Sequence, residues 1–268
     1  MKYKCLTIAG FDGSGGAGLQ ADLKTFSALG CYGMSVLTAL PIQNTCGVRN
    51  CVEIPLQAIK EQLEAIFDDI VPDSIKIGML FSSPIIELVA DFLTKHAINI
   101  PIVLDPVMVA KSGDPLLQPE AITAMKIKLI KLATIITPNL PEAYTLVGST
   151  SDAESLSKKL IQLGANAVLL KGGHSNGNNC NDFFLQQDGT HEWLRAKRIN
   201  SKNTHGTGCT LSAAICAFLA KGLPLVTACQ YAKRYLYGAL VAAKETSVGK
   251  GNGPVHHFYE WWDGFFSK

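Results

Sequence analysis

The turn Asn203–Ala213 contains the side chain whose type and setting most suggest chemistry, the thiol of Cys209. Its sequence is NTHGTGCTLSA, in which Gly206 and Gly208 flank Thr207 and an apolar run with helical spacing follows. Glycine allows the backbone to turn tightly and to approach a ligand closely. If a helix begins near Gly208, the unpaired N–H groups of its first turn and its positive end form a site for an anion such as a phosphoryl group. The alternative is a glycine-rich turn that holds a buried cysteine, because free cysteine is commonly buried.

Two charged residues come directly after predicted strands. Asp105 follows the apolar strand Ile102–Leu104, and Lys171 follows Ala167–Leu170 and precedes two glycines. Open α/β sheets bind ligands outside the carboxyl ends of their strands, so both side chains are candidates for a ligand site. The alternative for Asp105 is a helix cap, which Pro106 and the apolar residues after it disfavour.

Asn139 and Glu142 lie three residues apart in the segment PNLPE. Pro141 favours a helix start, and Asn139 is a good N-cap residue. On one helical turn the two side chains can reach the same point, where a carboxylate and an amide oxygen would suit a magnesium ion and its waters. A capping box that serves only the helix is equally compatible with this spacing.

A second glycine-rich segment raises the alternative of a dinucleotide-binding oxidoreductase. Gly13, Gly15 and Gly18 match the pattern G-x-G-x-x-G after a predicted strand and before a predicted helix. That fold also requires an acidic residue at the end of the second strand to hold the ribose. The predicted second strand, Met34–Leu40, is followed by no acid but by Gln43. A glutamine amide suits the edge of a heteroaromatic ring, although it is also an ordinary loop residue.

The elements that must position these residues alternate between strands and helices along the whole chain. This order predicts a single α/β domain over residues 1–268, with a mostly parallel sheet between helices. The predicted strands are Cys5–Ala9, Met34–Leu40, Ser74–Gly78, Ile102–Leu104, Thr134–Thr137 and Ala167–Leu170, with a hairpin of Phe183–Leu185 and His191–Arg195. The predicted helices are Leu19–Leu29, Leu56–Phe67, Ile85–Leu93, Leu117–Leu132, Leu156–Leu163, Thr210–Lys221 and Leu225–Lys244. Aromatic residues at helical spacing in Phe258–Phe266 are expected to pack on the domain or on a second subunit.

The composition excludes several classes of function. A net charge of +2, with acidic and basic residues spread along the chain, disfavours binding to nucleic acid or to an anionic membrane. Eight cysteines form no C-x-x-C pair, so neither a zinc site nor a disulfide framework is expected. No apolar segment approaches the roughly 18 residues of a membrane span, and the first residues lack a signal-peptide core. These features predict a cytoplasmic protein.

Taken together, the motifs resemble those of the hydroxymethylpyrimidine/phosphomethylpyrimidine kinases of thiamine synthesis, within the ribokinase-like superfamily. The resemblance covers nearly the whole chain. It is carried by TIAGFDGSGGAG, QNT at Gln43, KIGML at Lys76, LDPVMVAKSGD at Leu104, TPNLPEA at Thr137, LLKGGH at Leu169 and NTHGTGCTLSAA at Asn203. It implies a three-layer α/β/α sandwich, a homodimer, and transfer of phosphate from ATP with Mg²⁺.

The resemblance also implies a role for each matching residue. The substrate pyrimidine would lie against Gln43, with Gly10, Met79 and Val107 lining its pocket. ATP would be bound by Asn139, Glu142, Lys171 and Lys233, and magnesium by Asp105 and Glu142, largely through water. Gly206, Thr207 and Gly208 would form the anion hole, and Cys209 would stand where sugar kinases carry their catalytic aspartate. One departure is Phe11, which replaces a small hydroxyl residue in GFDGSGG and bears on substrate preference.

The proposed chemistry depends on the ionisation of Cys209. A free thiol has a pKa near about 8.5, and a helix N-terminus is expected to lower it. A Cys209 thiolate could act as the base that takes the proton of an alcohol acceptor. A phosphate monoester needs no such base, because it is largely ionised at pH 7. Two alternatives remain open at this point. One is a pyridoxal kinase, and the other is a protein that binds the pyrimidine without catalysis.

Overall fold

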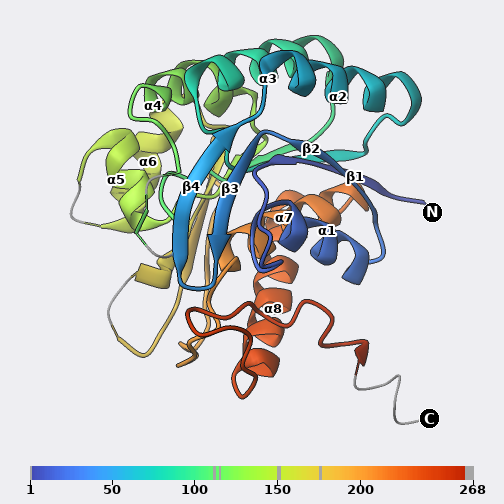
Figure 1. The fold of residues 1–268 in the computed structure, drawn as a ribbon. Coiled ribbons are helices and arrows are strands. Elements are labelled where there is room, and N and C mark those ends of the chain that lie inside the picture. The colour runs from blue at the N-terminus through green and yellow to red at the C-terminus, as the bar shows by residue number, and fades with distance from the viewer. Residues whose placement is uncertain (1, 111–112, 115, 150–151, 175–176, 263–268) are drawn as a thin grey trace.

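The chain folds around a mixed β-sheet covered by helices on both faces (Figure 1), in a computed structural model that describes residues 2–110, 113–114, 116–149, 152–174 and 177–262. The strands of the eight-stranded sheet are β1 (Lys4–Ala9), β2 (Tyr32–Leu37), β5 (Ser74–Ile77), β6 (Ile102–Leu104), β7 (Ile135–Ile136), β8 (Ala167–Leu170), β9 (Asp182–Gln186) and β10 (His191–Leu194). Their order is β10-β9-β8-β7-β6-β5-β1-β2, and β9 pairs in the antiparallel sense with both β8 and β10, whereas the other neighbours are parallel. The predicted fold class, with its mostly parallel sheet, is confirmed.

The helices form two layers. They are α1 (Gly18–Ala28), α2 (Leu56–Asp69), α3 (Ser83–His96), α4 (Ala121–Ala124), α5 (Leu140–Val147), α6 (Ala153–Gln162), α7 (Thr207–Ala220) and α8 (Leu225–Ala243). Helices α1, α7 and α8 cover one face of the sheet, and α2 to α6 cover the other (Figure 1). None of the helices in the described part of the chain is long and apolar enough to cross a membrane.

Alternating side chains of the strands supply both cores. Phe183 and Leu185 of β9 pack in the core under α2 to α6, whereas Phe184 packs in the core under α1, α7 and α8. Successive side chains of a strand point to opposite faces, so a strand buried on both sides reads as a continuous apolar run. This is why the sequence reveals most of these strands.

The predicted strand Met34–Leu40 is wrong at its end, because the chain leaves the sheet there. β2 stops at Leu37, and Thr38 donates its backbone N–H to Ala9 O (3.0 Å) and its hydroxyl to Met79 O (2.6 Å). The following residues form a separate two-stranded hairpin of β3 (Ala39–Asn44) and β4 (Gly47–Glu53). The apolar run of the sequence therefore spans two elements of different sheets.

Two further predictions about helices need correction or restriction. Helix formation begins at Ala121, not at Leu117, because the N–H groups of Leu116 and Leu117 bond to Met108 O. The rest of this stretch consists of α4, a π-helical turn (Met125–Leu129) and a 3₁₀ turn (Ile130–Leu132).

The aromatic C-terminal segment is described only to Trp262, and up to there it forms turns. Phe265 and Phe266 lie outside the described residues. Trp261 donates its indole N–H to Ala28 O (2.9 Å), which fixes this segment to the end of α1.

Candidate active site

A cavity of about 540 Å³ lies at the carboxyl ends of the parallel strands. All thirteen residues expected at the site line it, although they come from segments far apart in the sequence. They are Gly10, Gln43, Met79, Asp105, Val107, Asn139, Glu142, Lys171, Gly206, Thr207, Gly208, Cys209 and Lys233. The fold thus brings together the residues that the sequence singled out, while the role of each stays a prediction.

The start of α7 faces this cavity. Gly206 is the N-cap residue in the left-handed region, with φ 76°, and a side chain there would meet Gly16 O at 1.8 Å. Only glycine fits that position. Among the described residues, no acceptor is recorded for the backbone N–H groups of Gly208 and Cys209. The first turn of the helix therefore presents free donors and its positive end to the cavity, the arrangement that suits an anion.

The two glycine-rich segments are joined by the buried carboxylate of Asp12, a contact the sequence analysis missed. Asp12 accepts hydrogen bonds from the N–H groups of Ser14, Gly16 and Ala17 at 2.8–3.1 Å, and His205 Nε2 lies 2.7 Å from its Oδ2. Burial raises the pKa of Asp12, but the hydrogen bonds from His205 and Ser14 outweigh it and lower the pKa to about 2. Asp12 is therefore ionised at neutral pH and fixes one loop against the other.

Three charged side chains meet beside the start of α7, where Lys171 Nζ and Asp105 Oδ2 each lie 3.3 Å from the position of a side chain at Gly208. Lys171 Nζ lies 2.7 Å from Asp105 Oδ1 and 3.9 Å from Glu142 Oε2. Burial raises the pKa of Glu142, and although Lys171 opposes this, the pKa reaches about 7. Burial lowers the pKa of Lys171, but Asp105 and Glu142 outweigh this effect, so its pKa is raised and it stays protonated.

Asn139 and Glu142 form the capping box that was one of the two predicted alternatives. Asn139 Oδ1 accepts from the Glu142 N–H (2.9 Å), and Glu142 Oε2 accepts from the Asn139 N–H (2.8 Å). The interpretation of these residues as a capping box is therefore correct. It leaves Glu142 on the cavity wall beside Lys171, so a second role in binding is still open.

The donor set near Glu142 fits magnesium. Asp105 and Glu142 both offer carboxylate oxygens to the cavity. The described residues contain no group of three or more His, Cys, Asp or Glu side chains placed to hold a metal ion. Magnesium usually keeps several waters and binds through one or two carboxylates and the substrate's phosphates, which is what two carboxylates on one wall can provide.

The pKa of Cys209 contradicts the expectation that a helix N-terminus lowers it. Burial raises the pKa of its thiol to about 11, although Lys76 and the backbone N–H of Gly18 favour the thiolate. The helix N-terminus does not produce a low pKa, because the side chain is enclosed by protein except toward the cavity. In the free protein at neutral pH, Cys209 is therefore a thiol.

One end of the cavity, where the resemblance places the substrate, is lined by Gln43 of the β3–β4 hairpin. Gln43 donates its side-chain amide to Phe11 O (3.1 Å), and a side chain at Gly10 would meet Met79 Sδ at 2.9 Å. Phe11, the residue that departs from the family pattern, also lines this part of the cavity. At the other end, Lys233 is bonded to Asp182 Oδ2 and to Cys180 O, both at 2.7 Å.

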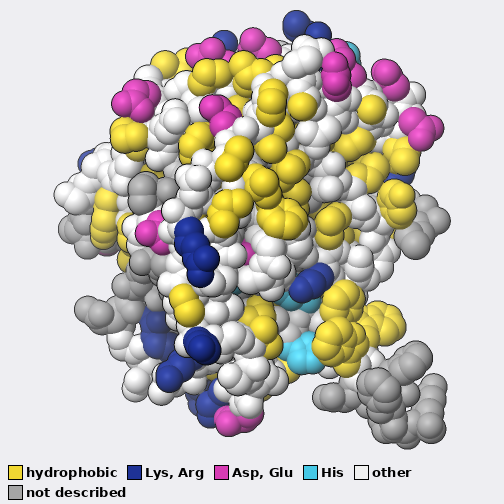
Figure 2. Space-filling view, viewed as in Figure 1, with side chains coloured by type: hydrophobic (Ala, Val, Ile, Leu, Met, Phe, Trp, Pro, Cys, Tyr) yellow, Lys and Arg dark blue, Asp and Glu magenta, His cyan; other side chains and the backbone are white. Residues whose placement is uncertain are grey.

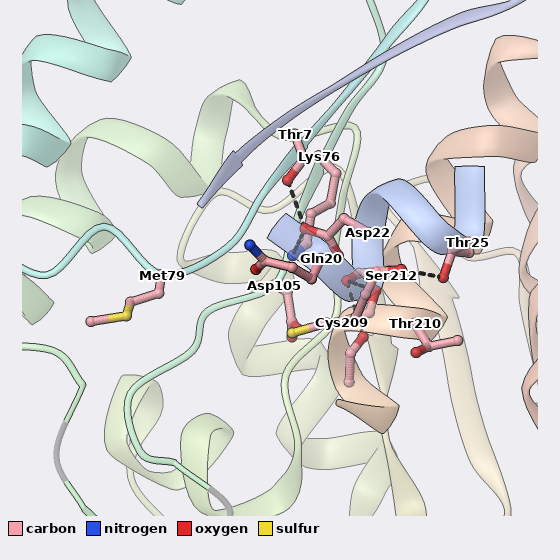
Figure 3. Close-up of polar contacts among 12 residues, drawn as sticks. Thr7, Gln20, Asp22, Thr25, Lys76, Met79, Asp105, Cys209, Thr210 and Ser212 are labelled. Carbon is pink, nitrogen blue, oxygen red and sulfur yellow. Dashed lines mark hydrogen bonds and ion pairs between the residues drawn. The ribbon is translucent and has the colours of Figure 1, made fainter. Parts of the chain in front are cut away.

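A fully buried ion pair borders the cavity and was not recognised from the sequence (Figure 3). Lys76 Nζ lies 2.8 Å from Asp22 Oδ2, and both side chains are inaccessible to solvent. A lysine inside the apolar strand SIKI was the available signal, but its partner on α1 is 54 residues away. Spacing alone could not have joined them.

Comparison with known proteins identifies the family. The model of the phosphomethylpyrimidine kinase family matches residues 12–256. A hydroxymethylpyrimidine/phosphomethylpyrimidine kinase of Salmonella typhimurium is 47% identical over 266 residues, which cover 97% of this chain and 99% of that protein. The chain belongs to the phosphomethylpyrimidine kinase family.

Solved structures agree with this assignment. The phosphomethylpyrimidine kinase of Clostridium difficile 630 superposes with a TM-score of 0.78 at 42% identity, covering 89% of this chain and 100% of that one. The pyridoxal kinase of Staphylococcus aureus in complex with pyridoxal has a TM-score of 0.87 at 33% identity, covering 97% and 95%. The fold is therefore the ribokinase-like α/β/α sandwich, and the protein is a kinase that uses ATP.

Proposed function

We propose that the protein phosphorylates 4-amino-5-hydroxymethyl-2-methylpyrimidine with ATP, first to the monophosphate and then to the diphosphate, for thiamine diphosphate synthesis. The observation that carries this proposal is the start of α7. The free N–H groups of Gly208 and Cys209 face the same cavity as Gln43 and the Asp105–Lys171 pair. An anion site, a ring-binding amide and a charged cluster in one cavity support transfer of a phosphoryl group to an aromatic alcohol.

Phosphoryl transfer depends on positioning and on neutralising charge more than on covalent help. The pyrimidine would lie beside Gln43 under the hairpin, with its CH₂OH toward Cys209. The N–H groups at the start of α7, together with Lys171, would stabilise charge on the transferring group. Mg²⁺, held by Asp105 and Glu142 largely through water, would supply further positive charge when bound. Asn139 and Lys233 complete the proposed ATP-binding residues.

The direct test is an assay of the purified chain with Mg²⁺, ATP and the pyrimidine alcohol. Phosphorus NMR would follow the monophosphate and then the diphosphate. Consumption of ATP that depends on the alcohol excludes the alternative of a protein that only binds the pyrimidine. A monophosphate that never proceeds to the diphosphate would refute the two-step function.

A second candidate is phosphorylation of pyridoxal, which also carries a hydroxymethyl group. The similarity to the S. aureus pyridoxal kinase supports this alternative. Comparison of kcat/KM for the two alcohols decides between them, because the favoured substrate should exceed the other by at least about tenfold if the pocket discriminates by 1.4 kcal/mol or more.

We also propose a homodimer that works in the cytoplasm. In the hairpin, Leu40, Ile42 and Val52 lie on the face opposite to Pro41 and Gln43, and Ile42 and Val52 are 44% and 46% exposed. Figure 2 shows apolar side chains gathered on the side of the molecule that carries this hairpin. A second copy that covers this face would support the hairpin over the substrate. The eight free cysteines favour a reducing compartment.

A further inference from the structure

Lys76 and Asp22 form a charge pair whose two side chains are fully buried. Lys76 projects from the interior strand β5, and Asp22 projects from α1. Asp22 Oδ2 accepts from Lys76 Nζ (2.8 Å) and from the Thr7 hydroxyl (2.6 Å), while Asp22 Oδ1 has no partner among the described residues. Such pairs are weak contributors to stability, because removing both charges from water offsets their attraction. Packing alone does not explain this pair.

The lysine end of the pair reaches the cavity. Lys76 lines the cavity together with Cys209, whereas Asp22 does not. A side chain at Gly78 would meet Lys76 Nζ at 2.7 Å, so the missing side chain of Gly78 leaves room for the ammonium. Burial lowers the pKa of Lys76, but Asp22, Cys209 and Asp105 outweigh this effect and raise it. The ammonium therefore stays charged at the cavity wall.

The charged groups around the Cys209 sulfur come from four elements. Lys76 from β5 favours the thiolate, whereas Asp22 from α1 and Asp105 after β6 oppose it. Lys171, after β8, is bonded to Asp105, and its Nζ lies 3.3 Å from the position of a side chain at Gly208. Lys171 thus lies beside the start of α7, where the phosphate is proposed to bind. Lys76 lies with Asp22 near Cys209 (Figure 3).

We propose that Lys76 is a positioning residue for the acceptor half of the reaction. Its ammonium, held in place by Asp22 and Thr7, stabilises negative charge on the Cys209 sulfur and on the acceptor oxygen next to it. This inference deepens the proposed function and depends on it for the identity of the acceptor. It assigns the buried pair to transfer onto the alcohol, whose oxygen must lose a proton, and not to transfer onto the monophosphate, which arrives ionised.

The reactivity of the Cys209 thiol tests this inference without any turnover. Iodoacetamide reacts with the thiolate, so its rate at a fixed pH near 7.5 reports the fraction of thiolate. The modified residue is followed by mass spectrometry of the tryptic peptide 203–221. That peptide also contains Cys216, whose side chain is fully buried and provides an internal control.

Three variants give results of different sign. Lys76→Met removes the cation, and we expect alkylation of Cys209 to slow about tenfold, which corresponds to one pKa unit. Asp22→Asn leaves the ammonium without its carboxylate, and alkylation should become faster. The double variant K76M/D22N leaves neither charge unpaired, so it guards against loss of folding. Because it also lacks the carboxylate that opposes the thiolate, its alkylation rate should lie between those of K76M and the unchanged protein. Equal rates in K76M, the double variant and the unchanged protein would overturn the proposal.

Kinetics of the two acceptors provide the second readout. In K76M/D22N we expect kcat for the pyrimidine alcohol to fall at least about tenfold, with a much smaller loss for the monophosphate. A purely structural role would reduce both equally, and that outcome would overturn the proposal. If the unchanged protein phosphorylated neither acceptor, the proposed function would fail, while the alkylation rates would still decide whether Lys76 controls Cys209.

Discussion

The thiol of Cys209 is subject to two opposed influences. Burial makes the thiolate unfavourable, whereas Lys76 and the Gly18 N–H stabilise it, and the balance is a pKa of about 11. A CH₂OH group must lose its proton during transfer, but a phosphate monoester has already lost it at pH 7. The same sulfur therefore faces different demands in the two steps of the proposed reaction.

Replacement of Cys209 by alanine should separate those steps. We expect the rate of the first phosphorylation to fall by roughly 10²- to 10⁴-fold, the usual contribution of a positioned acid or base. The second should fall by less than about tenfold, since its acceptor needs no base. Single-turnover rates with each acceptor measure this directly. The matched control is Cys180→Ala, which removes another thiol of the cavity wall but keeps the carbonyl that holds Lys233. Equal loss of both steps would mean that Cys209 only shapes the site.

Glu142 should make the stability of the free protein depend on pH. Its pKa is raised from 4.5 to about 7 by burial, so between these values the folded chain keeps a proton that the unfolded chain has lost. Stability then falls as the pH rises from 4.5 to 7, with a slope of at most about 1.4 kcal/mol per pH unit.

Glu142→Gln tests this dependence, because glutamine preserves the capping box but cannot ionise. Urea unfolding without nucleotide should show that the unchanged protein loses on the order of 1–3 kcal/mol relative to this variant between pH 4.5 and 7. Glu154→Gln, in the first turn of α6, is the control and should leave the pH profile as it was. Parallel pH profiles for all three proteins would contradict the assigned pKa.

At the residue scale, the sequence predicted which side chains share the cavity but not their electrostatic state. Residues that end parallel strands or begin helices, such as Asp105, Lys171 and Cys209, meet at one sheet edge by topology. Their pKa values depend on how completely neighbouring segments enclose them, which spacing does not reveal. The partnership of Lys76 with Asp22 was missed for the same reason.

At the scale of elements, the start of α7 is fixed by contact between two glycine-rich segments. Gly206 adopts a left-handed conformation against Gly16 O, and the Asp12 carboxylate bonds the loop on one side and His205 on the other. These contacts determine where the helix begins and where its free N–H groups point.

Gly206→Ala should therefore disrupt the site strongly, although the change adds only one methyl group. A non-glycine residue in this conformation costs about 1–3 kcal/mol, and its side chain would also clash with Gly16 O. Displacement of the anion site by about 1 Å is enough to reduce kcat about 10²-fold. Gly173→Ala is the matched control, since it borders the same cavity and meets no atom within 4 Å. Thermal unfolding and kcat together test the prediction, and equal behaviour of the two variants would refute it.

The elements that the sequence predicted well are those buried on both faces or closed by clear end signals. The β3–β4 hairpin was missed because Met34, Val36 and Ala39 form one apolar run, although Thr38 diverts the chain between them. The diversion depends on acceptors at Ala9 and Met79, which are distant in sequence. The expectation of a helix from Leu117 failed similarly, because Met108 O captures the N–H groups that a helix would have used.

At the scale of the whole molecule, the proposed homodimer should depend on the outer face of the hairpin. Two charges placed there in I42E/V52E would have to be buried without partners, so the dimer should dissociate. Analytical ultracentrifugation measures the change. The control is Val71→Glu with Ile98→Glu. These side chains are even more exposed, at 54% and 72%, but they precede β5 and β6 and so lie at the amino ends of the strands, away from the hairpin. A monomer in the unchanged protein would contradict the proposal.

The contact between Asp12 and His205 also has a consequence for biosynthesis. The two residues are 193 positions apart, so a nascent chain on the ribosome cannot close the glycine-rich loop until His205 has left the exit tunnel. Contacts of such long range form slowly, and until then the loop lacks the partner that holds it. A translation product that stops before residue 205 would retain the strands of the sheet's centre but could never assemble a phosphate-transferring site.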